Sequence, residues 1–267
     1  MCGIVGYIGK NDALPVLLEG LKRLEYRGYD SSGVGCIARG KIKVIKKEGR
    51  ISALESILPD KLQSTIGIAH TRWATHGGVC DANAHPQMSQ NGEVAVVHNG
   101  IIDNYVTLKS MLQSQGYKFV SETDTEVIAH LAEKNLRECK NPTLAVRKTL
   151  AMLEGTYGLL FLFRDHNDMV IGARNGSPLV VGVGEGEMFL ASDVNAIVSH
   201  TKQVIYLDDR ETVVLTRDSY RTTNLNDAVV DKTVECIDWD YEEVGKDGYE
   251  DFMLKEIFEQ PDAIERA

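Results

Sequence analysis

The sequence is short of cysteine pairs, long apolar runs and basic residues, and each shortage excludes a class of protein. Its five cysteines are widely spaced without a CxxC pair, which matches neither a disulfide framework nor a zinc site. No apolar run approaches the ~20 residues of a membrane span, and the start of the chain lacks the features of a signal peptide. We therefore expect a reducing, cytoplasmic setting and no membrane partner.

A formal net charge of −10 also argues against nucleic acid as a partner, because nucleic-acid binders normally carry a basic face. The 267 residues suffice for one large domain or two small ones with a buried core. The histidines are scattered without metal-ligand spacing, so we expect neither a metal nor an organic cofactor.

Hydrophobic periodicity predicts mixed helices and strands in the first half of the chain and mostly strands in the second. Residues 2–8 are interpreted as a buried strand that holds the N-terminus in a sheet. Helical patterns cover residues 13–25, 51–58, 105–116, 127–138 and 142–155, and strand patterns follow one another between 157 and 216. The short, hairpin-like connections favour antiparallel sheets with helices packed outside, an α+β layered architecture.

The end of the sequence differs in character from the rest. It becomes acidic and polar, and it then places Phe252, Leu254, Ile257 and Phe258 on one helical face. Because an amphipathic helix usually buries its apolar side, we expect a linker leading to a second domain, or a helix that docks on a partner.

A cysteine directly behind the initiator methionine is the first candidate for chemistry. Once Met1 is removed, Cys2 carries a thiol, with an ordinary pKa of about 8.5, and a free α-amino group, with a pKa of about 7.7–8.0. The amine can accept the thiol proton as sulfur attacks and then donate it to the leaving group. A cysteine at position 2 can equally be incidental, so other motifs must decide.

The motif "HNGIID" offers groups that could stabilise an oxyanion. The Asn99 side-chain amide and the Gly100 backbone N–H are suitable donors, because neither is covered by a bulky side chain. An ordinary Asn-Gly turn between two strands fits the same residues and is favoured when the motif is taken alone.

The motif "HTRWATHGG" predicts a strand that runs into a mobile loop. Arg72 can bind a carboxylate through two parallel hydrogen bonds. Aromatic and hydrogen-bonding side chains follow it at Trp73, Thr75 and His76. The loop is interpreted either as a substrate lid or as a surface loop with a structural arginine.

Two further residues are weaker candidates. In "SETDTEV", Asp124 can bind an ammonium group, although a helix cap is the simpler role for it within a capping-box pattern. His85 precedes Pro86, and its simplest role is to anchor a loop. Together, a nucleophile, oxyanion donors, a carboxylate binder and an ammonium binder would recognise glutamine.

Several motifs carry a resemblance to a known family. "MCGIVGYIG", "HTRWATHG", "VVHNGIIDN" and "ETDTEV" resemble the class II, N-terminal-nucleophile glutamine amidotransferases. "RLEYRGYDSSG" and "FMLKEIFEQPDAI" are similar to the glutaminase portion of the glucosamine-6-phosphate synthase family. The resemblance implies a four-layer αββα sandwich of two antiparallel sheets between helices. It also implies a glutaminase domain over residues 2–240, followed at 241–267 by a linker and the start of a helix connecting to a sugar-phosphate isomerase domain.

The resemblance assigns roles to the candidate residues. It implies that Cys2 is the nucleophile, with its own α-amine as base, and that Asn99 and Gly100 form the oxyanion hole. The residues implied to bind glutamine are Arg72 at the carboxylate, Asp124 at the α-amine, and Trp73, Thr75 and His76 beside the substrate. Those implied to support the site are Arg27, Gly28 and His85.

The implied reaction is hydrolysis of L-glutamine to L-glutamate and ammonia. In the full-length enzyme, which the resemblance implies is a homodimer, ammonia would pass to fructose 6-phosphate and yield glucosamine 6-phosphate for hexosamine synthesis. Two alternatives stay open, namely a module that binds an amino acid or a partner, and a glutaminase with another acceptor domain.

Overall fold

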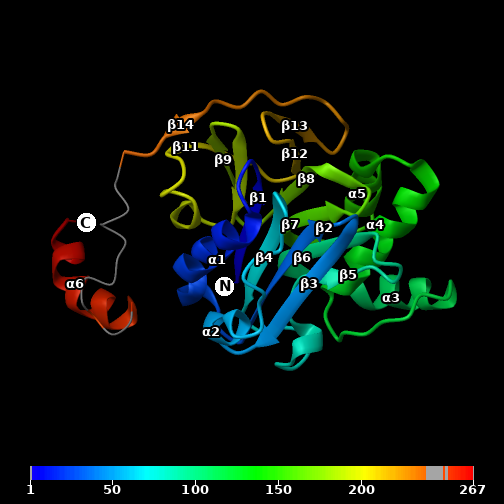
Figure 1. Ribbon diagram of the computed structural model, residues 1–267, viewed down its shortest axis with the longest axis horizontal. Coiled ribbons are helices and arrows are strands. Elements are labelled where there is room, and N and C mark those ends of the chain that lie inside the picture. Colours follow the sequence, from blue (N-terminus) through cyan, green and yellow to red (C-terminus); the bar gives the residue numbers. More distant parts are fainter. Residues whose placement is uncertain (1, 239–248, 250–251, 267) are drawn as a thin grey trace. The chain divides into compact units, whose positions relative to one another are not determined.

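The computed structural model describes residues 2–238, 249 and 252–266, and the strands among them form two antiparallel sheets (Figure 1). In the order of their pairing, the strands of the first sheet are β14 (Glu235–Cys236), β11 (Gln203–Tyr206), β9 (Val180–Gly184), β10 (Glu187–Ala191), β1 (Gly3–Ile8), β4 (Ile66–Arg72), β2 (Ser31–Ala38) and β3 (Lys41–Glu48). Those of the second are β13 (Tyr220–Asn224), β12 (Glu211–Leu215), β8 (His166–Asn175), β7 (Gly155–Phe163), β6 (Val94–Ile102) and β5 (Gln87–Met88). Neighbouring strands are antiparallel throughout both sheets.

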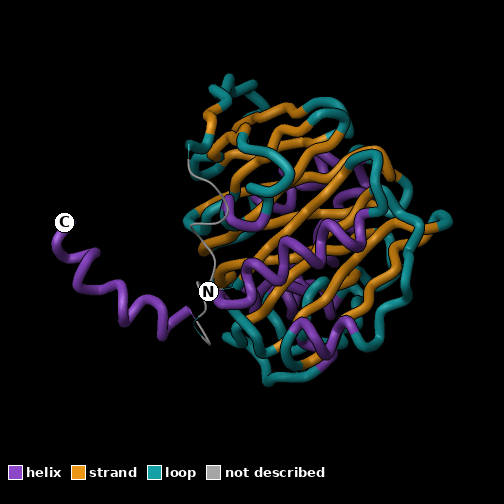
Figure 2. The backbone as a smooth tube through the Cα atoms, turned by 60° about the vertical axis from the view of Figure 1, so that its left-hand side comes forward, coloured by secondary structure: helices purple, strands orange, loops and turns teal. Residues whose placement is uncertain are grey.

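Helices cover the outer face of each sheet, and Figure 2 shows helical segments on both sides of the strands. Helices α1 (Ala13–Leu24) and α2 (Ile51–Glu55) pack on the first sheet, and α3 (Tyr105–Ser114), α4 (Thr125–Cys139) and α5 (Pro142–Leu150) pack on the second. Alternate residues of a strand face opposite layers. Accordingly, Ile4 and Ile8 of β1 join the core between the sheets, whereas Val5 lies against Gly20 of α1. The predicted four-layer αββα sandwich is therefore confirmed.

Strand β1 lies in the middle of its sheet and holds the N-terminal end of the chain. All six of its residues are buried between β10 and β4. At the first two residues of the strand, Gly3 N–H donates to Thr71 Oγ1 (3.1 Å) and Ile4 N–H donates to Ser192 Oγ (3.0 Å). Burying one large aliphatic side chain stabilises by roughly 1.5–3 kcal/mol, which offsets the ~1–2 kcal/mol needed to order one residue's backbone. The expectation of a buried N-terminal strand is confirmed.

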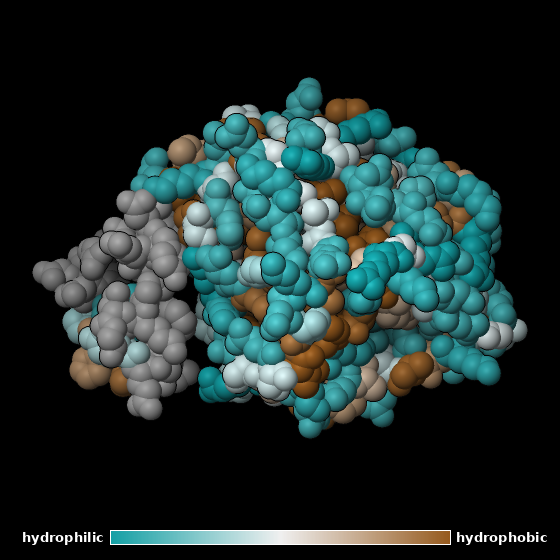
Figure 3. Space-filling view, viewed as in Figure 1, coloured by the Kyte–Doolittle hydropathy of each residue, from teal (hydrophilic) through white to brown (hydrophobic). Residues whose placement is uncertain are grey.

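The C-terminal part of the chain, from Asp238 to Ala267, forms a unit separate from residues 1–237. Its helix α6 spans Phe252–Arg266 and leaves Ile257 and Phe258 exposed. The predicted domain boundary at residue 240, and most of the predicted linker after it, lie outside the described residues. None of the described helices has the length and apolar character that a membrane span requires. The face of the protein drawn in Figure 3 is mostly hydrophilic.

Candidate active site

A cavity of about 340 Å³ lies where the ends of β1, β4 and β6 meet the start of α4. All the predicted site residues except Gly28 line it, namely Cys2, Arg27, Arg72, Trp73, Thr75, His76, His85, Asn99, Gly100 and Asp124. Segments far apart in the sequence thus converge on one space. A pocket of this size and polarity is typical of a site for a small molecule.

Cys2 lies at the edge of this cavity, directly before β1. Its sulfur accepts a hydrogen bond from the Trp73 backbone N–H at 3.2 Å. Burial raises the pKa of the Cys2 thiol, and the Trp73 N–H only partly opposes this effect. The thiol is therefore protonated near neutral pH and needs a proton acceptor to become a nucleophile.

Asn99 and Gly100 lie within strand β6, which runs without interruption from Val94 to Ile102. The alternative prediction of an Asn-Gly turn is wrong, because this segment pairs with β7 along its whole length. The Asn99 Nδ2 donates to the backbone oxygen of Cys2 at 2.9 Å. Gly100 has φ +134°, and an added Cβ would overlap the carbonyl oxygen of Thr156. Asn99 therefore contacts the cysteine directly, and Gly100 follows it in the strand and lines the same cavity.

Arg72 ends strand β4, and the loop after it wraps around its guanidinium group. The guanidinium donates to the backbone oxygens of Gly78 (3.2 Å), Gly77 (3.3 Å) and His76. This arrangement matches the interpretation of Arg72 as a structural arginine, and the residue still lines the cavity. In the same loop, Trp73 is 48% exposed, whereas the ring of His76 packs edge-on against Tyr105 at 5.1 Å between ring centroids.

Asp124 precedes helix α4, but its side chain does not cap that helix. Instead, Asp124 Oδ2 accepts a hydrogen bond from the Ile102 backbone N–H at 2.9 Å. The His98 ring lies 3.9 Å away, and burial lowers the pKa of His98, so that the ring is neutral near pH 7 and does not balance the carboxylate. Asp124 thus occupies the N-cap position, but the alternative prediction that its side chain caps the helix is wrong. A buried carboxylate in this cavity is suited to bind a cation such as an ammonium group.

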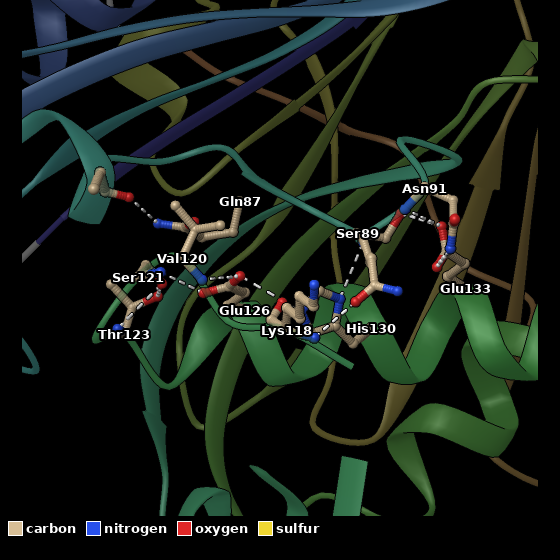
Figure 4. Close-up of polar contacts among 12 residues, drawn as sticks. Gln87, Ser89, Asn91, Lys118, Val120, Ser121, Thr123, Glu126, His130 and Glu133 are labelled. Carbon is tan, nitrogen blue, oxygen red and sulfur yellow. Dashed lines mark hydrogen bonds and ion pairs between the residues drawn. The ribbon is translucent and has the colours of Figure 1, made fainter. Parts of the chain in front are cut away.

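In the predicted capping box, the Glu126 side chain would bond to the backbone N–H at the start of its own helix. This prediction is wrong as well, because Glu126 instead holds the chain that leads into Asp124 (Figure 4). The Glu126 carboxylate accepts hydrogen bonds from the backbone N–H groups of Val120 (2.8 Å) and Ser121 (2.6 Å). The side chain thus reaches back beyond the first turn of α4. Two charge-assisted bonds of this kind fix the entry to the helix.

Further along α4, two more buried side chains hold neighbouring loops (Figure 4). His130 Nε2 donates to the Lys118 oxygen at 3.2 Å. Glu133, which is fully buried, accepts from Ser89 Oγ (2.7 Å) and from the Asn91 side-chain amide (2.8 Å). These bonds hold the chain between α3 and α4 and the chain between β5 and β6 on the same helix.

We expect Glu126→Gln to lower the free energy of unfolding by about 2 kcal/mol at pH 7, because an amide cannot accept both N–H bonds as well as a carboxylate does. Burial raises the pKa of Glu126, but hydrogen bonds from His130, Val120 and Ser121 bring it below its ordinary 4.5. A carboxyl whose pKa is lowered by folding stabilises above its unfolded pKa and loses this effect as the pH falls through the folded pKa. In urea unfolding, the difference in free energy of unfolding between the wild type and Glu126→Gln should therefore shrink as the pH falls below 4.5. The exposed Glu138→Gln is the control, and an equal deficit of Glu126→Gln at every pH would contradict the assignment.

The supporting residues hold the walls of the cavity. Arg27 Nη1 donates to Asp193 Oδ2 (2.8 Å) and to the Ser192 oxygen (3.3 Å), which links the site to the end of β10. Gly28 does not line the cavity; an added Cβ at this position would come within 2.8 Å of the Arg72 carbonyl carbon. Its lack of a side chain therefore permits close backbone packing beneath the loop.

His85 lies in a loop that a half-buried lysine holds against β3. Lys46 Nζ donates to the backbone oxygens of Ala84 (2.8 Å), Ala82 (3.0 Å) and Pro86 (3.3 Å). His85 Nδ1 lies 3.3 Å from His70 Nε2. The expected loop anchor is thus mainly Lys46, and His85 contacts a second buried histidine.

Sequence reasoning missed part of the cavity wall, which also includes His98, Ile101, Thr123, Thr125, Thr156, Ser177 and Pro178. His98 stands next to Asn99 in a quoted motif and could have been proposed from that position. Thr156, Ser177 and Pro178 belong to the second half of the chain, where no motif marks them. Only the pairing of β6 with β7, and of β7 with β8, brings this region to the site.

Comparison with known proteins shows which proteins the chain is similar to. A family model described as a glutamine amidotransferase domain matches residues 70–199. Proteins named glutamine–fructose-6-phosphate aminotransferase (isomerizing) from Aquifex aeolicus and Caldanaerobacter subterraneus are 51% and 49% identical over 99% of this chain. The chain contains a glutamine amidotransferase domain. The whole chain spans 44% and 43% of the length of those two relatives.

Solved structures agree with the assignment of this amidotransferase domain. A glutamine phosphoribosylpyrophosphate amidotransferase from B. subtilis is 27% identical, with a TM-score of 0.72 over 85% of this chain and 50% of its own. A structure described as the allosteric regulatory enzyme of purine biosynthesis is 28% identical, with a TM-score of 0.73 over 84% of this chain and 49% of its own. The sandwich of two sheets between helices is thus shared with amidotransferases.

Proposed function

We propose that this domain hydrolyses the side-chain amide of L-glutamine to L-glutamate and ammonia through a thioester on Cys2. The observation that carries the proposal is the convergence of Cys2, Asn99 and Gly100 on one cavity, with Arg72 and Asp124 in its wall. The first three supply a nucleophile and oxyanion donors, and the last two match the charges of an amino-acid head group.

In the proposed reaction, removal of Met1 gives Cys2 a free α-amine. The amine accepts the thiol proton while sulfur attacks the amide carbon of glutamine, and Asn99 Nδ2 and Gly100 N–H stabilise the resulting oxyanion. The carbon–nitrogen bond then breaks, and the amine returns the proton to the departing ammonia. Water attacks the thioester, which releases glutamate and restores the thiol.

For the substrate, we propose that Asp124 binds the α-ammonium group of glutamine and that Arg72 binds its carboxylate. A guanidinium group has five N–H donors, so Arg72 can bind the substrate while it bonds to its own loop. Thr75 and His76 would lie beside the head group, and Trp73 would cover the site as part of a mobile loop. Arg27, Gly28 and His85 would support these residues.

The longer protein is a further part of the proposal. We propose that this domain is the glutaminase portion of a glutamine–fructose-6-phosphate aminotransferase, with the domain ending near residue 240 and a linker and helix leading onward. Ammonia would then pass to fructose 6-phosphate on an isomerase domain and give glucosamine 6-phosphate for hexosamine synthesis. A homodimer in the cytoplasm completes this proposal. Support comes from relatives of that name that are about twice as long as this chain.

A chemical label tests the glutaminase proposal directly. The chain is incubated with a glutamine-derived diazoketone and then analysed by intact and peptide mass spectrometry. A single adduct on Cys2 of a chain without Met1 supports the enzyme. Absence of the adduct while glutamine still binds would favour a module that only binds an amino acid.

We expect Asp124→Asn to raise the KM for glutamine by about 10- to 100-fold, because a charge-assisted bond to an ammonium group contributes about 1.5–3 kcal/mol. The effect on kcat should be smaller, since the head group does not react. Initial-rate measurements of glutamate release provide both constants. Asp103→Asn, at an exposed aspartate in the turn after β6, is the control. A fall in kcat with an unchanged KM would contradict the assigned role.

A further inference from the structure

His70 is a fully buried histidine of β4 that lies behind the proposed oxyanion hole without lining the cavity. One ring nitrogen, Nε2, lies 3.0 Å from the backbone oxygen of His98, 3.0 Å from Asn99 Oδ1 and 3.3 Å from His85 Nδ1. The other nitrogen, Nδ1, is buried without a hydrogen-bond partner among the described residues. The proposed reaction gives this side chain no role.

The contacts of Nε2 fix the state of the His70 ring. A backbone oxygen can only accept, so the contact with His98 requires the proton of His70 to be on Nε2. The bare Nδ1 agrees with this, because a buried N–H without a partner would be more costly than a buried lone pair. Burial also lowers the pKa of His70 to about 3, so the ring stays neutral with one N–H throughout the neutral range.

The same reasoning fixes the orientation of the Asn99 amide. The atom that faces the His70 N–H must be an acceptor, which is Oδ1, and Nδ2 then faces the opposite way. At that end, Nδ2 is 2.9 Å from the Cys2 oxygen, which also can only accept. Reversing the amide would lose both hydrogen bonds, because Nδ2 would then face the His70 N–H and Oδ1 would face the Cys2 oxygen. Each buried group left unpaired in this way costs about 1–3 kcal/mol.

We infer that His70 is a positioning residue, which keeps the amide of Asn99 turned so that Nδ2 faces Cys2. This inference rests on the proposed function of Asn99 as an oxyanion donor. Nδ2 carries two hydrogens, and the Cys2 oxygen takes one, which leaves the second for the oxyanion. Without His70, the reversed amide would bring an oxygen towards the developing negative charge.

The test compares two uncharged replacements in the full chain. The Nε2 of glutamine is as many bonds from Cα as the Nε2 of histidine, so His70→Gln retains a donor towards Asn99, whereas His70→Leu removes it. We expect His70→Leu to lower kcat by about 10- to 100-fold, somewhat less than the loss of a whole oxyanion donor, with KM changed less than about 3-fold. His70→Gln should restore kcat to within about 5-fold of wild type. Should His70→Leu fail to fold, His70→Asn replaces it, because its amide is one bond too short to reach Asn99.

A double-mutant cycle separates positioning from a general structural effect. If His70 acts through Asn99, adding His70→Leu to Asn99→Ala should lower kcat by less than about 3-fold more. A full, independent effect in the Asn99→Ala background would overturn the inference, and so would a wild-type kcat in His70→Leu. A wild-type chain that releases no glutamate would instead refute the proposed function itself.

Discussion

Replacing Cys2 with alanine is expected to lower kcat for glutamine hydrolysis by at least about 10⁴-fold, the scale seen when the nucleophile of a covalent mechanism is removed. Asn99, Gly100 and the head-group contacts would remain, but no thioester can form. Glutamine should still bind, because Cys2 contributes little to recognition of the head group. Glutamate release and calorimetric binding, measured on the same preparation, would show activity and affinity changing separately.

The matched control is Cys236→Ala, which removes an exposed thiol at the far edge of the same sheet. It should leave the rate unchanged. A second form of the chain, with one non-removable residue before Cys2, keeps the thiol but converts its α-amine to an amide. Burial raises the pKa of the Cys2 thiol, so the thiol needs a base in order to lose its proton. Because an amide cannot act as that base, this form should be nearly as inactive as Cys2→Ala. Persistent activity in either variant would refute the thioester mechanism.

The sequence predicts the fold well where a pattern is local. Helix α1 and the strands from β7 to β12 follow from the spacing of apolar residues. The apolar residues of a buried face recur every three or four positions in a helix and every second position in a strand. The short strands β5 and β14 have two residues each, which is too little for any pattern. Strand β13, with two threonines among its five residues, has no apolar alternation either.

In the candidate site, local sequence patterns fail to predict the hydrogen-bond partners of key residues. The neighbours of Asp124 in the sequence favour a cap over an ammonium binder, yet its hydrogen-bond partner is the N–H of Ile102, which is 22 residues away. Asn99 and Gly100 fit a turn by composition, yet pairing with β7 keeps them in a strand. In both cases tertiary hydrogen bonds outweigh a local preference that is itself worth only about 1 kcal/mol. The resemblance to a family predicts roles for these residues that the local pattern does not predict.

Gly100→Ala is the second change for which we expect a large effect, on both stability and activity. Gly100 has φ +134°, a conformation that side chains rarely adopt, and an added Cβ would overlap the Thr156 carbonyl oxygen across the β6–β7 ladder. Neither backbone can move without disturbing a central strand pair. We expect a loss of about 4 kcal/mol or more in the free energy of unfolding, which single substitutions reach only through strain or overpacking.

The chain offers a control that separates strain from overlap. Gly116 also has a positive φ, of +89°, but no atom lies within 4 Å of an added Cβ. Gly116→Ala should therefore lose only the ~1–2 kcal/mol of the left-handed conformation, and its kcat should stay near that of wild type. Gly100→Ala, assayed below its own Tm, should lose at least about 10²-fold in kcat, because the overlap moves an oxyanion donor away from Cys2. Equal stability of the two variants would mean that the close approach of Gly100 to Thr156 does not constrain the site.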